Sequence, residues 1–193
     1  ARMDRVAAAL QRDGLPAGDA IAICAATAID YATVYLGALR AGVVVAPLAP
    51  GSTPEAFARM LLDAGARVLF TDASAADTVG DAGRGAVVRI ALDGSGAGQP
   101  LEDWLATPGT HPAPVVVEPG WAFNIIYSSG TTGVPKGIVQ SHGMRWAHVT
   151  RGARYGYGSD TVTLLSTPLY SNTTLVVLFP TLAYGGTVLL MPR

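Results

Sequence analysis

Short apolar runs alternate with longer helix-like runs along most of this 193-residue sequence, and that alternation strongly limits the folds open to it. Strand-like runs span residues 19–24, 43–47 and 67–71, and the runs between them carry apolar residues three or four positions apart. No short hairpin turn joins these strands, so consecutive strands should be parallel, with helices crossing between them. We therefore predict an α/β fold with three layers, α/β/α, around a mostly parallel, doubly wound sheet.

Local signals mark the ends of several elements. Thr53 and Pro54 are residue types preferred at the N-cap and first position of a helix, and Gly65 is suited to end that helix. Residues 93–114 are rich in Gly, Pro, Ser and Thr, so we predict a surface crossing there rather than a linker between domains. The other expected elements are helices at 29–41, 143–154 and 173–183, and strands at 86–91, 121–127, 137–140, 161–165 and 187–191.

The composition argues against several classes of function. A formal net charge of −1 provides no basic field that would attract nucleic acid, so no nucleic-acid partner is expected. Cys24 is the single cysteine and lies in an apolar run, which excludes a disulfide framework and favours a buried thiol in a cytoplasmic protein. No apolar stretch reaches the roughly 20 residues of a membrane span. The sequence predicts no oligomeric state.

The most distinctive segment is Y-S-S-G-T-T-G-V-P-K-G, residues 127–137, which directly follows an expected strand. It ends with Lys136, the only lysine in the chain, whereas the other twelve basic side chains are arginines. Glycines let backbone N–H groups approach a ligand, hydroxyls add donors, and the ammonium adds a charge, which together suit nucleotide phosphates. From composition alone, a Ser/Thr/Gly linker is the alternative. The order of residues matches neither the Walker A nor the G-x-G-x-x-G pattern.

That order closely resembles the signature of the adenylate-forming superfamily, which includes acyl-CoA synthetases, peptide-synthetase adenylation domains and firefly luciferase. The usual pattern is (Y/F)-T-S-G-T-T-G-x-P-K-G, and only Ser128 departs from it, with one hydroxyl replacing another. Further segments are similar to the family at residues 31–47, 51–55, 138–142, 167–170 and 182–186. The resemblance thus extends over nearly the whole chain.

The resemblance implies activation of a carboxylic acid by ATP and Mg²⁺ to an acyl-adenylate, with release of pyrophosphate. The acyl group would then pass to coenzyme A, as in an acyl-CoA synthetase. It assigns contacts with the β- and γ-phosphates to Ser128, Ser129, Gly130, Thr131, Thr132 and Gly133, and the catalytic role to Lys136, which would neutralise the departing pyrophosphate. No residue is assigned as a metal ligand, and no Cys/His cluster indicates zinc.

The substrate side departs from the pattern. Many acyl-CoA ligases carry His after Pro-Leu-Tyr, whereas Ser171 and Asn172 follow Tyr170 here. The substrate pocket is therefore assigned to Tyr170, Ser171 and Asn172, with the alternative that Ser171 and Asn172 cap the following helix. His142 is expected to pack or cap.

Residues 1–193 are expected to be part of the N-terminal, ATP-binding domain of a longer enzyme and to be inactive alone. The alternatives are a nucleotide-binding module without chemistry and a peptide-synthetase adenylation domain, although the F-D-x-S run usual in the latter is missing. The partner is expected to be a small-molecule carboxylic acid.

Overall fold

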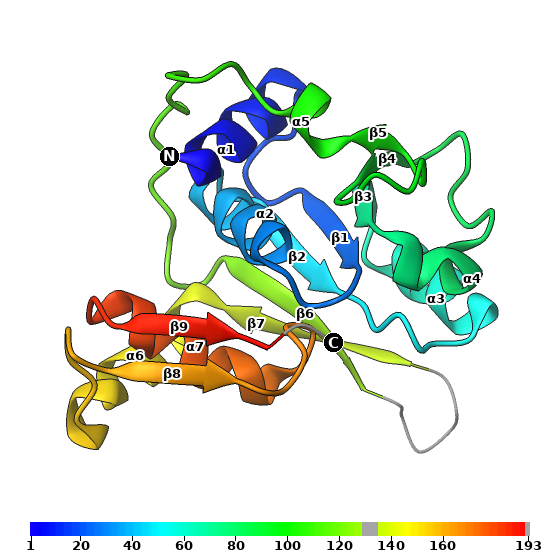
Figure 1. The fold of residues 1–193 in the computed structure, drawn as a ribbon. Coiled ribbons are helices and arrows are strands. Elements are labelled where there is room, and N and C mark those ends of the chain that lie inside the picture. The colour runs from blue at the N-terminus through cyan, green and yellow to red at the C-terminus, as the bar shows by residue number, and fades with distance from the viewer. Residues whose placement is uncertain (129–134, 192–193) are drawn as a thin grey trace.

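The computed structural model describes residues 1–128 and 135–191 and is built on one large sheet (Figure 1). Among the described residues this sheet has seven strands in the order β5-β4-β3-β1-β2-β6-β7. All neighbouring pairs are parallel except β6 and β7, which are antiparallel. The strands are β1 (Ala20–Cys24), β2 (Val44–Pro47), β3 (Ala66–Thr71), β4 (Val88–Ala91), β5 (Gln99–Pro100), β6 (Ala122–Ser128) and β7 (Lys136–Ser141).

Strand β1 shows why both faces of the sheet are covered. Ile21 and Ile23 join an apolar cluster with α1 (Arg2–Arg12) and α2 (Ile29–Arg40), whereas Ala22 and Cys24 join another with α3 (Pro54–Asp63) and α4 (Ala76–Val79). Successive side chains of a strand point to opposite faces, so helices lie on both sides. In Figure 1 the pair α1 and α2 lies away from α3 and α4. The predicted three-layer, doubly wound α/β fold is confirmed.

The local signals at α3 act as expected. Thr53 is the N-cap, and its hydroxyl accepts a hydrogen bond from the Ala56 N–H at 3.2 Å, while Pro54 is the first helical residue. Gly65 follows the helix with φ of +61°, a left-handed conformation that glycine adopts without steric cost.

The expected surface crossing at 93–114 is only partly correct. It contains β5 and a short helix, α5 (Leu101–Trp104), in which Trp104 is 2% exposed. The Trp104 indole N–H donates to Asp13 Oδ2 at 2.7 Å, and its ring meets Phe70 edge to face at 5.1 Å between centroids. The sequence did not predict α5, because Gly- and Ser-rich segments surround it and the partners of Trp104 lie far away in the sequence.

The remaining elements pack beside the large sheet. They are α6 (His142–Arg151), the 3-10 helix η2 (Gly152–Tyr155), β8 (Val162–Leu165), α7 (Asn172–Ala183) and β9 (Thr187–Leu190). Strands β8 and β9 form a separate parallel pair, with α7 as the crossover. A helix was expected at 143–154. In the structure, α6 ends at Arg151 and the chain continues as the 3-10 helix η2. The 3-10 helix η1 (Ala73–Ala75) completes the described elements. None of the helices in residues 1–128 and 135–191 has the length and hydropathy needed to cross a membrane.

Candidate nucleotide-binding site

The hairpin of β6 and β7 brings together the two ends of the predicted phosphate loop. Ser128, the last residue of β6, pairs with Lys136, the first residue of β7. Both side chains are exposed, and Lys136 forms no ion pair with any residue in the described ranges. Its ammonium is thus available to an anionic ligand at the loop end of the hairpin. Ser129, Gly130, Thr131, Thr132 and Gly133 lie outside the described residues.

A hydrogen bond anchors this end of the hairpin to helix α3. The Tyr127 hydroxyl lies 2.7 Å from Asp63 Oδ2 and 3.1 Å from the Met60 carbonyl oxygen. Burial, together with the hydrogen bond and charge of Asp63, raises the pKa of Tyr127 above its ordinary value. A Cβ at Gly137 would come within 3.1 Å of Asp63 Oδ2 and 3.2 Å of the Tyr127 ring, so glycine permits this close approach. Tyr127, the residue before Ser128, is therefore fixed to helix α3, which covers one face of the large sheet.

Beside this anchor lies a cavity of about 330 Å³. It opens at the carboxyl ends of β2 and β6, where open α/β sheets generally bind ligands. Ser128 and Pro135, which flank the loop, line it together with Tyr170 from the turn before α7. The other lining residues come from β2, α3 and their connection, with Tyr127: Pro47, Leu48, Ala49, Ser52, Ala56, Met60 and Tyr127. The structure thus places Tyr170 next to the loop.

Ser171 and Asn172 occupy the start of α7. Ser171 is the N-cap residue, although its side chain makes no capping hydrogen bond, and Asn172 is the first helical residue. Asn172 Oδ1 accepts from Gln140 Nε2 at 3.2 Å and from Arg145 Nη2 at 3.0 Å, and the same Arg145 nitrogen donates to Gln140 Oε1. These three side chains tie the end of β7 to the start of α7. In the described structure, neither Ser171 nor Asn172 lines the cavity beside the loop.

Arg145 is buried without a carboxylate partner among the described residues. It is 2% exposed, and its guanidinium carbon lies 5.4 Å from the Phe123 ring centroid and 5.6 Å from that of Phe179. Burial lowers its pKa. Cation–π contacts and neutral amides therefore offset part of the cost of burying this charge.

His142 and Cys24 lie in surroundings that indicate a structural role rather than a catalytic one. His142 begins α6 and meets Phe123 edge to face at 5.1 Å, as the packing interpretation predicts. Cys24 is fully buried, and burial raises the pKa of its thiol to about 12, so it stays protonated and unreactive at neutral pH. Within the described ranges, no group of three His, Cys, Asp or Glu side chains could hold a metal ion.

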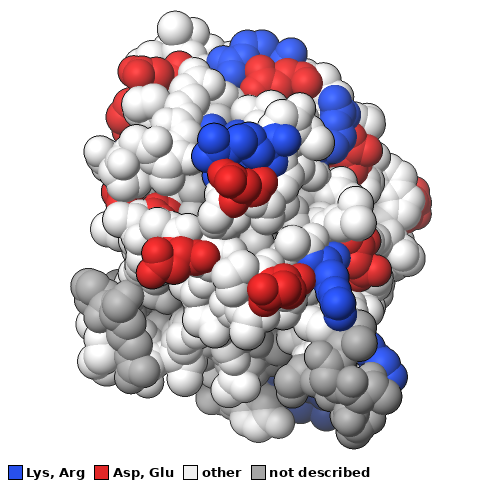
Figure 2. Space-filling model, turned by 90° about the vertical axis from the view of Figure 1, so that its right-hand side faces the viewer, with Lys and Arg blue, Asp and Glu red and all other residues white. Residues whose placement is uncertain are grey.

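Charges on the surface are mixed. On the face drawn in Figure 2, Lys and Arg side chains lie next to Asp and Glu side chains rather than in separate regions. Two exposed ion pairs, Arg67–Asp19 and Arg84–Asp81, each at 2.7 Å, are examples of basic and acidic side chains lying together on the surface. No single-sign field dominates this face.

Comparison with known proteins agrees with the geometry. The family model described as "AMP-binding enzyme" matches residues 1–193. The chain belongs to the AMP-binding enzyme family. It is similar to phosphinothricin tripeptide synthetase PhsB of Streptomyces viridochromogenes, at 32% identity over 98% of this chain and 15% of that protein. It is also 32% identical to 4-coumarate–CoA ligase 3 of Oryza sativa, over 98% of this chain and 35% of the rice protein.

Solved structures show the same fold. Apo MatB from Rhodopseudomonas palustris matches with a TM-score of 0.83 and 27% identity, over 100% of this chain and 38% of that one. The N-terminal domain of FACL13 from Mycobacterium tuberculosis matches with a TM-score of 0.80 and 24% identity, over 99% of this chain and 48% of that chain. The 193 residues therefore span about a third or less of these curated relatives and under half of the solved chains.

Sequence reasoning did not find Asp63, Gln140 or Arg145. Asp63 lies 64 positions from Tyr127, and Arg145 lies 27 positions from Asn172, so no local pattern links these partners. An arginine within the apolar face of α6 was the one available signal for a buried charge.

Proposed function

We propose that this chain forms the phosphate-binding part of an enzyme that activates a carboxylic acid with ATP and transfers the acyl group to coenzyme A. In the reaction, a carboxylate oxygen attacks the α-phosphorus of ATP, a new O–P bond forms, and the bond to pyrophosphate breaks. The products of this step are an acyl-adenylate and pyrophosphate. The thiol sulfur then bonds to the acyl carbon, the bond from that carbon to the AMP oxygen breaks, and AMP and the thiol proton are released.

One observation carries the proposal: Ser128 and Lys136 pair at the loop end of the β6–β7 hairpin, beside a cavity that Ser128 and Tyr170 line. Negative charge grows on the leaving pyrophosphate during attack, and an ammonium already in place stabilises it. Lys136 is assigned this role because it is exposed and forms no ion pair in the described ranges. Ser128 would donate to a phosphate oxygen.

Magnesium would accompany ATP. Phosphate oxygens and water would supply most of its ligands, as is usual for Mg²⁺ with nucleotides. When bound, the ion would neutralise phosphate charge. The task of this chain's own residues is to hold the phosphates and orient the α-phosphorus toward the acid.

The proteins similar to this chain differ in the thiol that accepts the acyl group, which is coenzyme A in some names and a carrier protein in others. Those similar to this chain include 4-coumarate–CoA ligases and an L-proline–[L-prolyl-carrier protein] ligase from Streptomyces coelicolor, 35% identical over 74% of this chain and 29% of that protein. The segment 167–170, Thr-Pro-Leu-Tyr, supports coenzyme A, because it resembles the corresponding stretch of CoA ligases. A carrier-protein thiol is the alternative acceptor.

The test is acid-dependent exchange of pyrophosphate into ATP by the natural protein that contains this chain, with a panel of fatty, aryl and dicarboxylic acids. We expect Lys136→Ala to reduce exchange by about 10²–10³-fold, the usual effect of removing one transition-state donor. The matched control is Arg84→Ala, which removes another exposed cation and should leave exchange unchanged. Equal exchange by Lys136→Ala and the parent protein would refute the role of Lys136.

Two further results would change the assignment. ATP binding without exchange for any acid would favour a nucleotide-binding module without chemistry. Exchange followed by acylation of a carrier protein, but not of coenzyme A, would favour a peptide-synthetase adenylation domain. We expect residues 1–193 alone to give no exchange, because the relatives bearing the activity names are much longer.

A further inference from the structure

The carboxylate of Asp63, the last residue of α3, lies against both strands of the β6–β7 hairpin. Its Oδ2 accepts the hydrogen bond from the Tyr127 hydroxyl on β6 at 2.7 Å. The same oxygen would lie 3.1 Å from a Cβ at Gly137 on β7. Tyr127 pairs with Gly137, and the next pair toward the loop is Ser128 with Lys136. This carboxylate therefore contacts the hairpin one residue away from both Ser128 and Lys136.

The loop end of the hairpin has few other attachments. In the described structure β6 pairs with β2 only at Asn124, opposite Val45, and the rest of its pairing is with β7. Strand β7 is at the edge of the sheet, and residues 136–139 are exposed. Figure 1 shows β6 and β7 extending past the neighbouring strands toward the loop. Within residues 1–128 and 135–191, only Tyr127 makes side-chain hydrogen bonds from this end of the hairpin to another element.

The helix itself does not favour an aspartate at this position. A carboxylate at the C-terminus of a helix lies close to the partial negative charge of the helix dipole, which is unfavourable. Asp63 is exposed and forms no ion pair with any residue that the structure describes. The contact with the hairpin is therefore the interaction that favours a carboxylate here.

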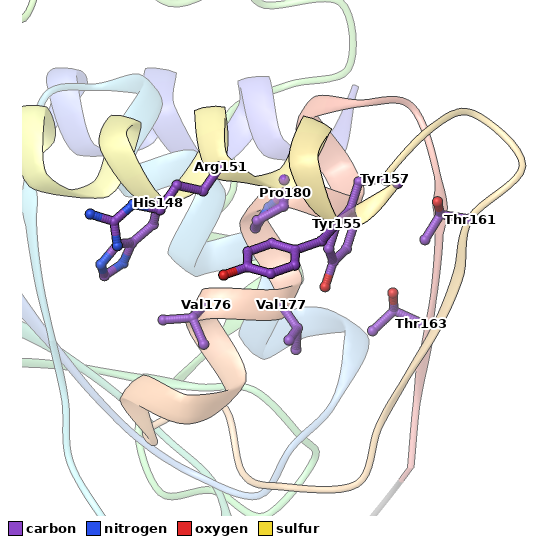
Figure 3. A pocket seen from close by; sticks show the side chains of 11 residues that line it. His148, Arg151, Tyr155, Tyr157, Thr161, Thr163, Val176, Val177 and Pro180 are labelled. Atoms are coloured by element: carbon purple, nitrogen blue, oxygen red, sulfur yellow. The ribbon is translucent and has the colours of Figure 1, made fainter.

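Asp63 lies outside the cavities in which a ligand would meet the site. The cavity beside the loop is lined by Tyr127 but not by Asp63. A larger cavity, of about 640 Å³, lies between α6 and α7 and is lined by Arg151 and Tyr155, again without Asp63 (Figure 3). An effect of Asp63 on the reaction would therefore pass through Tyr127 rather than through contact with a substrate.

We propose that Asp63 is a positioning residue for the adenylation step: through the Tyr127 hydroxyl it fixes the loop end of the hairpin and thereby the position of Lys136. The inference rests on the proposed function, because it concerns the same step. A displacement of about 1 Å at a reacting group lowers a rate by as much as about 10²-fold. A hydrogen bond to an ionised carboxylate is roughly twice as strong as one between neutral groups, which suits the anchoring of an exposed strand end.

The charge of Asp63 separates its effect on ATP binding from its effect on rate. ATP is an anion, so a nearby carboxylate disfavours its binding, although solvent and salt screen the exposed charge. Removing Asp63 should therefore leave the KM for MgATP unchanged or lower it. The rate at saturating ATP should fall, because Lys136 is then less well placed to meet the charge that grows on pyrophosphate.

The test is acid-dependent exchange of pyrophosphate into ATP by the natural protein that contains this chain. Asp63→Ala and Tyr127→Phe should each lower the rate at saturating ATP about tenfold and raise the KM for MgATP by no more than about twofold. Asp63→Asn keeps an oxygen that accepts from the Tyr127 hydroxyl and should recover most of the rate. The matched control is Asp103→Ala, because Asp103 is also exposed and without an ion pair in the described ranges but lies on α5.

Double variants identify the path of the effect. If Asp63 acts through Tyr127, the double variant Asp63→Ala/Tyr127→Phe should be no slower than the slower single variant. If the effect reaches Lys136, Asp63→Ala should change the rate by less than about twofold in a protein that already carries Lys136→Ala. A tenfold effect of Asp63→Ala in that background would overturn the proposal, as would a parental rate for Asp63→Ala itself.

A second measurement keeps this inference separate from the proposed function. Hydrogen–deuterium exchange of the backbone amides of β6 and β7 should be faster in Asp63→Ala and Tyr127→Phe than in the parent protein or Asp103→Ala. If the parent protein gives no pyrophosphate exchange, the proposed function fails, while faster amide exchange still supports the anchoring of the hairpin by Asp63. If the parent protein is active and Asp63→Ala has parental kinetics and amide exchange, only this inference fails. Thermal unfolding of each variant verifies folding.

Discussion

Replacing Tyr127 by Phe should lower the free energy of unfolding by about 1 kcal/mol at pH 8. The variant keeps the ring and loses only the hydroxyl that lies 2.7 Å from Asp63 Oδ2. A hydrogen bond to a charged group contributes about 1.5–3 kcal/mol, but Asp63 is exposed and returns to water in the variant, which reduces the loss. The Met60 carbonyl keeps its bond from the Ala64 N–H at 2.9 Å, so no buried acceptor is left unpaired.

The effect should depend on pH in a defined direction. The pKa of Tyr127 is raised in the folded protein, so its contribution is complete below the unfolded value of about 10 and is lost as pH rises above it. For a fully buried phenol the loss would be about 1.4 kcal/mol per pH unit, and solvent around this half-buried one makes it smaller. The parent protein should therefore lose its advantage over Tyr127→Phe between about pH 10 and pH 11.5.

Urea unfolding followed by circular dichroism, at pH 8 and at half-unit steps from pH 10, measures both quantities. A loss of 1 kcal/mol corresponds to a fall in Tm of about 2–4 °C for a chain of this size. Tyr155→Phe is the control, because Tyr155 is 77% exposed and should show neither effect. A stability difference that stays constant from pH 8 to pH 11.5 would refute the assigned cause, and equal stability at pH 8 would refute the hydrogen bond's contribution.

Two further changes test contacts inside the fold, one between α1 and α2 and one at the buried Arg145. Gly37→Ala should destabilise the protein by about 1–2 kcal/mol, because the new Cβ would lie 2.6 Å from Val6 Cβ where α1 crosses α2. This cost should exceed the gain from alanine's higher helix propensity. Unchanged thermal unfolding would contradict this expectation. Arg145→Met should change the free energy of unfolding by less than about 1 kcal/mol, because it removes a buried charge together with its hydrogen bonds, and Gln140 still bonds Asn172. A loss above 3 kcal/mol in chemical unfolding would show that the guanidinium stabilises the fold.

The large sheet could be predicted because its signals are local. Fully apolar strands such as 20–24, the Thr53–Pro54 cap and glycines after helices each act within a few residues, so the α/β alternation follows from the sequence. The antiparallel pairing of β6 and β7 had no such signal, because their connection is not a two-residue turn. The separate pairing of β8 with β9 was equally hidden, since it joins residues 25 positions apart through α7, as in Val162 with Thr187.

Some features of the candidate site could likewise be predicted from local sequence, and others could not. The ordered run at 127–137 indicates phosphate chemistry by its residue types, and the structure brings Ser128 and Lys136 together. The Asp63 anchor of Tyr127 and the Arg145–Asn172 bond arise only when distant elements pack, so sequence order could not reveal them. The cavity lined by Arg151 and Tyr155 likewise depends on how α6 meets α7.

The position of the single lysine has a practical consequence. Lys136 is exposed at the first residue of β7, and the other basic side chains in the chain are arginines and histidines. An amine-reactive reagent such as an activated ester therefore has one side-chain target in this sequence. Peptide mapping after brief acetylation would report directly on that one position. Slower modification of Lys136 with ATP present would give a footprint of nucleotide occupancy without any need for turnover.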